Sequence, residues 1–188
     1  RSGLSIMARL IGLLRPLSPH MGLAILLGVL GHLCAIAIPV LGALALWMAF
    51  TQRGAEARGL FPWIAAAGLL RGVLHYGEQN RNHYVAFTLL KIIRDHVFGA
   101  LRRLGPARMD SKNKGDLIST VTSDIELLEV FYAHTISPIC IAVLVEIVMC
   151  LFIGSYHWSL GLLALCAFLC VGVALPLIIS RRSGTLGD

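Results

Sequence analysis

Charged side chains are scarce in this sequence, and two long stretches contain none. They make up 14% of the 188 residues, whereas a soluble domain usually carries about 25%. No Asp, Glu, Lys or Arg occurs from Pro16 to Gln52 or from Ile147 to Ser180. Each run is longer than the roughly 20 apolar residues that span a bilayer. The composition therefore excludes an ordinary soluble domain and predicts an all-α membrane protein.

Two kinds of chemical motif are also missing. None of the five cysteines belongs to a Cys-x-x-Cys pair, so no disulfide framework or zinc spacing is visible. The phosphate-binding loop Gly-x-x-x-x-Gly-Lys-Ser/Thr is absent, and we expect that this chain alone does not hydrolyse ATP. The net charge of +6 comes from basic residues that flank apolar segments, which argues against a nucleic-acid partner.

Several apolar segments are present, separated by polar connections. Membrane spans are predicted at about residues 20–50, 60–82, 130–153 and 160–180. A short amphipathic elbow helix over residues 5–16 would precede them in the membrane interface. The links predicted between neighbouring spans are a polar turn over residues 51–59 and a tight aromatic turn over residues 154–159. The fold predicted is four long helices in a lipid bilayer.

The middle of the chain changes from an apolar to an amphipathic pattern. One continuous helix is predicted from about Leu60 to Leu104, roughly 65 Å long at 1.5 Å per residue. Because a hydrocarbon core is only about 30 Å thick, this helix must project from the membrane. Gly105-Pro106 ends it, and the next helix is predicted from Leu117 to about Ile153. Residues 83–129 would then form a hairpin outside the bilayer, either coupled to a soluble partner or purely structural.

The basic residues predict the orientation of the spans. Twelve of the sixteen lie on one side of the predicted membrane segments, and only Arg53 and Arg58 lie on the other side. Basic residues concentrate in cytoplasmic loops, so the first side should be the cytoplasm. An even number of spans leaves both ends of the chain there. We expect a multi-pass protein of the plasma (inner) membrane.

The connector between the two long helices resembles the first intracellular loop of ABC exporters. The similarity rests on Asp110-Ser-Lys-Asn-Lys-Gly-Asp-Leu-Ile-Ser119 and on Asp124-Ile125-Glu126. It implies that residues 18–188 form the first four transmembrane helices of a type 1 exporter domain, with a coupling loop at residues 106–114. Arg108-Met109 departs from the pattern, because many exporters have an aromatic residue there. The resemblance assigns coupling to Asp110, Ser111, Lys112, Asn113, Lys114, Gly115 and Asp116.

A narrower similarity is to the CydC-type subunit of bacterial thiol exporters. The residues that carry it are Tyr76-Gly77-Glu78, His83, Phe87, Arg94, Phe131-Tyr132 and Ile136-Ser137-Pro138. It implies ATP-driven export of a cysteine- or glutathione-type solute from the cytoplasm, together with a second half-transporter. A heterodimer is favoured and a homodimer stays open. ATP-Mg would bind in a nucleotide-binding domain that this sequence lacks, so we expect the chain to be an N-terminal fragment of a longer subunit.

Three ionisable residues of the second predicted span share one helix face, because Arg71, His75 and Glu78 are spaced i, i+4, i+7. Ionisable groups at membrane depth usually face a bundle interior or an aqueous cavity. One interpretation is a cavity for an anionic or zwitterionic solute, with Arg71 on its carboxylate. The other is an intrahelical Arg71–Glu78 network that lines hydrated space. Glu146, alone in the third predicted span, is either a cavity group or paired within the bundle.

His83 is the one candidate cofactor ligand. It matches a histidine that the CydC-type resemblance associates with haem ligation, and neutral imidazole suits an axial iron site. A single histidine on a helix is more often structural. The alternative function is therefore a self-contained four-helix membrane protein, haem-binding or structural, without transport activity. No other metal site is predicted.

Overall fold

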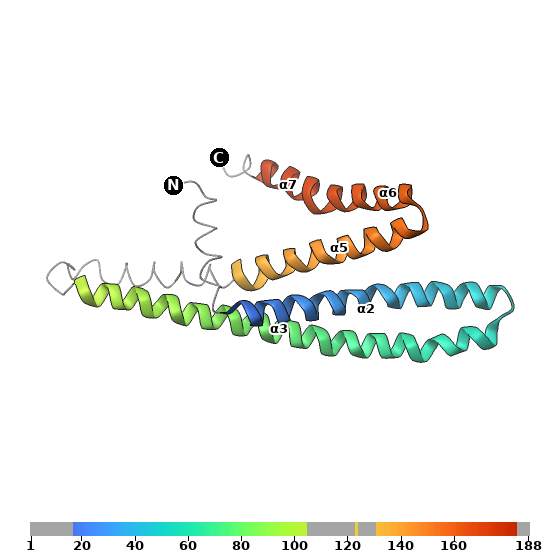
Figure 1. Cartoon of the computed structure of the whole chain (residues 1–188), viewed down its shortest axis with the longest axis horizontal. Coiled ribbons are helices and arrows are strands. Elements are labelled where there is room, and N and C mark those ends of the chain that lie inside the picture. Colours follow the sequence, from blue (N-terminus) through green and yellow to red (C-terminus); the bar gives the residue numbers. More distant parts are fainter. Residues whose placement is uncertain (1–16, 105–122, 124–130, 184–188) are drawn as a thin grey trace. The chain divides into compact units, whose positions relative to one another are not determined.

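The computed structural model describes residues 17–104, 123 and 131–183. Every element in these ranges is a helix and none is a strand, so the predicted all-α fold class is confirmed (Figure 1). The predicted elbow helix at 5–16 and the predicted coupling loop at 106–114 lie outside the described residues.

Helix α2 runs from Ser18 to Phe50 and confirms the first predicted helix. The link to α3 is shorter than the turn predicted at 51–59, because α3 already begins at Gly54. Gln52 adopts a positive φ of 63° at this sharp reversal. Arg53 forms an ion pair with Glu56 in the first turn of α3, so these polar residues belong to a helix start. An acidic side chain is favourable there because it faces the positive end of the helix dipole.

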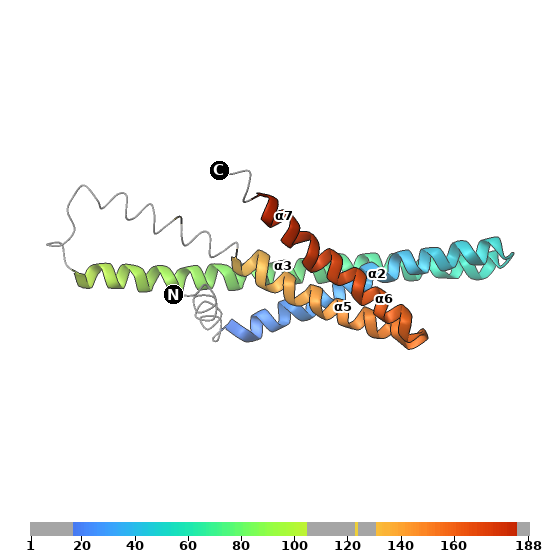
Figure 2. The same ribbon diagram turned by 90° about the horizontal axis from the view of Figure 1, so that it is seen from above.

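Helix α3 is a single helix of 51 residues, Gly54–Leu104. The predicted uninterrupted helix is confirmed, and at 1.5 Å per residue it is about 76 Å long. Helices α2 and α3 lie side by side and run in opposite directions in both views (Figures 1 and 2). A core of Leu17, Met21, Val85 and Leu89 packs between them near the start of α2.

The C-terminal part contains two antiparallel helical segments with irregular turns. The elements are a π turn η3 (Tyr132–Ile136), α5 (Ser137–Tyr156), α6 (Trp158–Leu169), a π turn η4 (Cys170–Ala174) and α7 (Leu175–Ser183). The tight turn predicted over 154–159 is wrong in extent, because only His157 lies outside a helix. The backbone N–H of Ser159 donates to Nδ1 of His157 at 3.3 Å, which caps the start of α6.

Both π turns stand at the same distance before a proline. Turn η3 ends at Ile136, two residues before Pro138, and η4 ends at Ala174, two residues before Pro176. Proline has no N–H to donate, and its ring crowds the carbonyl four residues earlier. A π turn accommodates this by inserting an extra residue into the helix. Neither turn is predicted from the sequence.

Three described helical segments are long and apolar enough to cross a membrane: Ser18–Phe50, His134–Tyr156 and Trp158–Ile179. They support a multi-pass membrane protein. Helix α3 is not among these segments, because Arg71, Glu78 and Arg81 interrupt its apolar part. The second span at 60–82 therefore stays a prediction.

The chain divides into two compact units between Ile141 and Ala142. The first contains α2, α3, η3 and the first turn of α5; the second contains the rest of α5 together with α6, η4 and α7. Within the second unit, α5 and α6 approach most closely at two glycines. A Cβ built on Gly161 would lie 2.8 Å from the Cα of Gly154. Backbones come this close only where both helices lack side chains.

Candidate functional site: a buried polar seam

Buried polar side chains gather where α3 meets α2 and the start of α5. Glu78, Asn82 and Ser137 are only 6%, 2% and 0% exposed. His83, next to Asn82 on α3, is half-buried. We call these four residues the polar seam. Burial of polar groups is costly unless they find partners, so such a concentration is a candidate binding site.

Glu78 reaches the seam because α2 has a glycine opposite it. A Cβ built on Gly28 would lie 3.1 Å from Cδ of Glu78 and 2.8 Å from Cγ1 of Ile141. The carboxylate contacts Nδ1 of His75 at 3.3 Å, and the His75 side chain is 61% exposed. Nδ1 of His32 lies 2.8 Å from the carbonyl oxygen of Gly28. Three helices thus converge on the carboxylate of Glu78.

The structure brings together only part of the predicted cavity set. Arg71 is exposed and forms no hydrogen bond or ion pair within the described residues, so the intrahelical Arg71–Glu78 network is not formed. His75 is the residue that contacts Glu78. Glu146 belongs to the second compact unit, where a Cβ on Gly172 would lie 3.6 Å from its Oε1.

His83 does not present an open haem site. Its ring stacks on Phe87 with centroids 5.8 Å apart and meets the ring of His134 edge-on at 5.9 Å. Nδ1 of His83 is buried without a hydrogen-bond partner. An axial ligand needs an apolar slot wide enough for a porphyrin, and these two rings cover His83 instead. Within the described residues, no three His, Cys, Asp or Glu side chains form a metal-binding group. The residues present do not fit the haem prediction.

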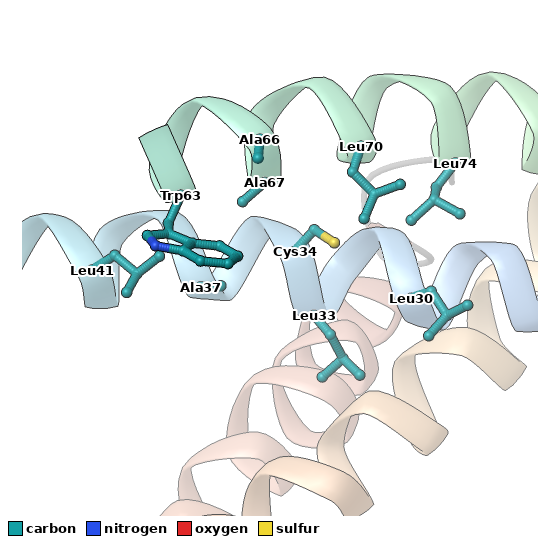
Figure 3. A pocket seen from close by; sticks show the side chains of 10 residues that line it. All are labelled: Leu30, Leu33, Cys34, Ala37, Leu41, Trp63, Ala66, Ala67, Leu70 and Leu74. Atoms are coloured by element: carbon teal, nitrogen blue, oxygen red, sulfur yellow. The ribbon is translucent and has the colours of Figure 1, made fainter. Parts of the chain in front are cut away.

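An apolar groove lies elsewhere between α2 and α3 (Figure 3). Its volume is about 590 Å³, and Trp63 extends from α3 toward Leu41 and Ala37 of α2. The other lining residues are Leu30, Leu33, Cys34, Ala66, Ala67, Leu70 and Leu74. This lining suits hydrocarbon, so the groove is not the polar solute cavity predicted around Arg71.

Asn82 and Ser137 are members of the seam that sequence reasoning missed as site residues. Both are neutral, and a neutral polar residue in an apolar helix gives little signal by itself. Ser137 precedes Pro138, and this pair could have indicated a break in the helix at that level. Asn82 stands one turn after Glu78, which places both on one face of α3.

Comparison with known proteins assigns the family. Residues 21–185 match the model of the ABC transporter transmembrane region. Over 182 residues the chain is 42% identical to a "Probable ABC transporter ATP-binding/permease protein" of Haemophilus influenzae, covering 96% of this chain and 33% of that protein. No solved structure gives a significant match.

Two further relatives are named as transport proteins for thiols. Each is a "Glutathione/L-cysteine transport system ATP-binding/permease protein CydC". The one from Haemophilus influenzae is 32% identical over 69% of this chain and 21% of its own length. The one from Escherichia coli is 25% identical over 75% of this chain and 26% of its own length. The chain thus spans a third or less of the relatives it matches. It belongs to the family of ABC transporter transmembrane regions, as its sequence predicted.

Proposed function

We propose that the chain is the membrane-spanning part of an ATP-driven exporter that moves a thiol or amino-acid-like solute out of the cytoplasm. The similarity to an ATP-binding/permease protein over 96% of the chain carries this proposal. The solute class is supported by the two CydC relatives, whose names specify glutathione and L-cysteine. The solute therefore belongs to the cysteine or glutathione type.

Energy for transport would come from a nucleotide-binding domain. ATP-Mg binds there in our proposal, because the relatives combine ATP binding and permease in one named protein. A second half-transporter completes the assembly in the bilayer, with a heterodimer favoured over a homodimer. Both ends of this chain face the cytoplasm of a plasma (inner) membrane, in line with the distribution of basic residues.

Coupling between the two domains is proposed for residues 106–114, which follow α3 directly. Helix α3 is about 76 Å long, more than twice the roughly 30 Å hydrocarbon core. With a span at 60–82, its last two dozen residues extend beyond the bilayer. This length supports a coupling role, because a helix can transmit displacement between the nucleotide-binding domain and the membrane.

The solute site is proposed to involve Arg71, His75 and Glu78 of α3. The exposed positions of Arg71 and His75 leave both accessible on α3. Glu78 anchors this face through its contact with His75. A guanidinium and a carboxylate on one helix face complement the two charges of a zwitterionic solute.

Charge reversal in the coupling loop tests the proposal in the full-length protein. We expect Asp110→Lys and Asp116→Lys to lower ATP-dependent glutathione or cysteine transport into inside-out vesicles about tenfold, while ATP hydrolysis continues. The reason is that an acidic loop loses its docking contacts when its charge is reversed. Transport and ATPase rates are measured on the same preparations.

Asp95→Lys is the matched control, because Asp95 is an exposed acidic residue on α3 outside the loop. It should keep the ratio of transport to hydrolysis. An unchanged ratio in the two loop variants would refute the coupling assignment. Coupled transport of another solute without transport of a thiol would refute only the solute class.

A further inference from the structure

Unpaired polar atoms are concentrated in the polar seam. In the described part of the chain, the buried side-chain atoms without a hydrogen-bond partner are Asn82 Oδ1, His83 Nδ1 and Ser137 Oγ. Folded proteins pair nearly all such atoms, because leaving a buried polar atom unpaired is destabilising. Two of them are oxygens, Asn82 Oδ1 and Ser137 Oγ, and a small ligand bound between these two would give each a partner.

The contacts between the helices place these atoms at one level. The His83 ring meets His134, while the side chains of Ile141 and Glu78 both lie against Gly28 of α2. Helix α3 therefore runs antiparallel to η3 and the start of α5. Asn82 is one turn beyond Glu78, and Ser137 is one turn before Ile141, so Asn82 and Ser137 stand opposite each other.

The chemistry of the seam favours a cation. Its oxygens are the carboxylate of Glu78, the amide oxygen of Asn82 and the hydroxyl of Ser137. No lysine or arginine forms an ion pair with Glu78 in the described ranges. Oxygen donors with one carboxylate suit a hard cation. Transition metals are disfavoured, since no three metal-binding side chains meet in these ranges.

The three unpaired side-chain atoms are closed to water. The ligand must therefore be about as small as a dehydrated ion, which favours Na⁺ over K⁺.

We propose that the polar seam binds one Na⁺ ion between α3 and the start of α5, through Glu78, Asn82 and Ser137. The ion would join the start of α5 to α3, because Ser137 belongs to α5 and Glu78 and Asn82 belong to α3. This inference does not depend on which solute the full-length protein moves.

Thermal unfolding of the purified full-length protein tests the site with sodium alone as the probe. NaCl should raise the unfolding temperature saturably by about 2–4 °C over choline chloride at equal ionic strength, because a ligand of the native state stabilises it. KCl should have a smaller effect. Asn82→Leu should abolish the Na⁺ response. Asn80→Leu, at an exposed asparagine on the same helix, should keep it.

A second pair of variants, both at Ser137, distinguishes the effect of losing the hydroxyl oxygen from the effect of a larger side chain. Ser137→Thr and Ser137→Val are nearly equal in size, but only threonine retains an oxygen. The threonine variant should respond to Na⁺ and the valine variant should not, even if both are less stable than the wild type. Equal unfolding temperatures in NaCl and choline chloride would overturn the proposal. So would equal Na⁺ responses of the two variants, because the Ser137 hydroxyl would then not be a ligand.

Discussion

Replacing Gly161 by alanine should separate the α5–α6 hairpin and lower the stability of the full-length protein by about 2–3 kcal/mol. The new Cβ would lie 2.8 Å from the Cα of Gly154, 3.3 Å from its backbone nitrogen and 3.2 Å from the carbonyl oxygen of Cys150. All three are backbone atoms, so no side-chain rotation relieves the overlap. The helices must move apart along their whole contact. Unfolding by titration with sodium dodecyl sulfate measures the loss.

Gly154→Ala provides a control within the same contact. A Cβ on Gly154 would lie 3.7 Å from the Cα of Gly161, an ordinary van der Waals distance. This variant should change the stability by less than about 1 kcal/mol. The two glycines face each other, yet only one has no room for a methyl group. Equal losses in the two variants would contradict the described packing of the hairpin.

Gly28→Ala should disrupt the three-helix contact beneath Glu78 at a cost of about 1–3 kcal/mol. Its Cβ would lie 2.8 Å from Cγ1 of Ile141 and closer still to Cδ1, and Ile141 is 2% exposed with little room to turn. The carboxyl carbon of Glu78 would be 3.1 Å away. Gly22→Ala on the same helix is the control, since nothing lies within 4 Å of that Cβ. It should stabilise α2 by up to about 1 kcal/mol, because alanine is a better helix former than glycine.

A double-variant cycle shows whether Ile141 causes the loss. Ile141→Ala alone should cost about 2–5 kcal/mol by leaving a cavity. Combined with Gly28→Ala, it makes room for the new methyl group. The double variant should therefore be more stable than the sum of the two single losses implies, by about 1 kcal/mol. Strict additivity would show that the contact between α2 and α5 does not limit this position.

Local patterns in the sequence were enough to predict the long helices. The charge-free run that contains α2 and the absence of proline in the second half of α3 are properties of contiguous residues, and α-helices depend mainly on contiguous residues. The links were harder to predict. Residues 54–59 look like a polar turn, but the Arg53–Glu56 ion pair belongs to a helix start. Polarity alone does not distinguish a loop from an exposed first helical turn.

The polar seam could be predicted only in part, because its partners come from distant segments. Glu78 stood out as an acid at membrane depth. Its burial depends on Gly28, about fifty residues earlier, and on Ile141, about sixty residues later. No spacing rule within α3 reveals these neighbours. An Arg71–Glu78 network was one of the two interpretations of this helix face; His75, one turn closer to Glu78 on α3, makes the contact instead.

Prolines alone did not reveal the π turns. Pro39 in α2 and Pro62 in α3 stand within regular α-helix, while Pro138 and Pro176 follow π turns. A proline, which lacks the backbone N–H, is therefore compatible both with a regular α-helix and with a preceding π turn. The packing around each site decides between a bent α-helix and an inserted residue.

Bending stiffness is unevenly distributed along this chain. Helix α3 is one continuous α-helix from Gly54 to Leu104, and after Pro62 no proline interrupts its backbone hydrogen bonds, so it resists bending. The two C-terminal segments each contain a π turn, at Tyr132–Ile136 and at Cys170–Ala174, where regular α-helical hydrogen bonds are replaced. A force applied at the Leu104 end would therefore displace α3 as one body. The C-terminal segments would instead bend at their π turns, η3 just before α5 and η4 between α6 and α7.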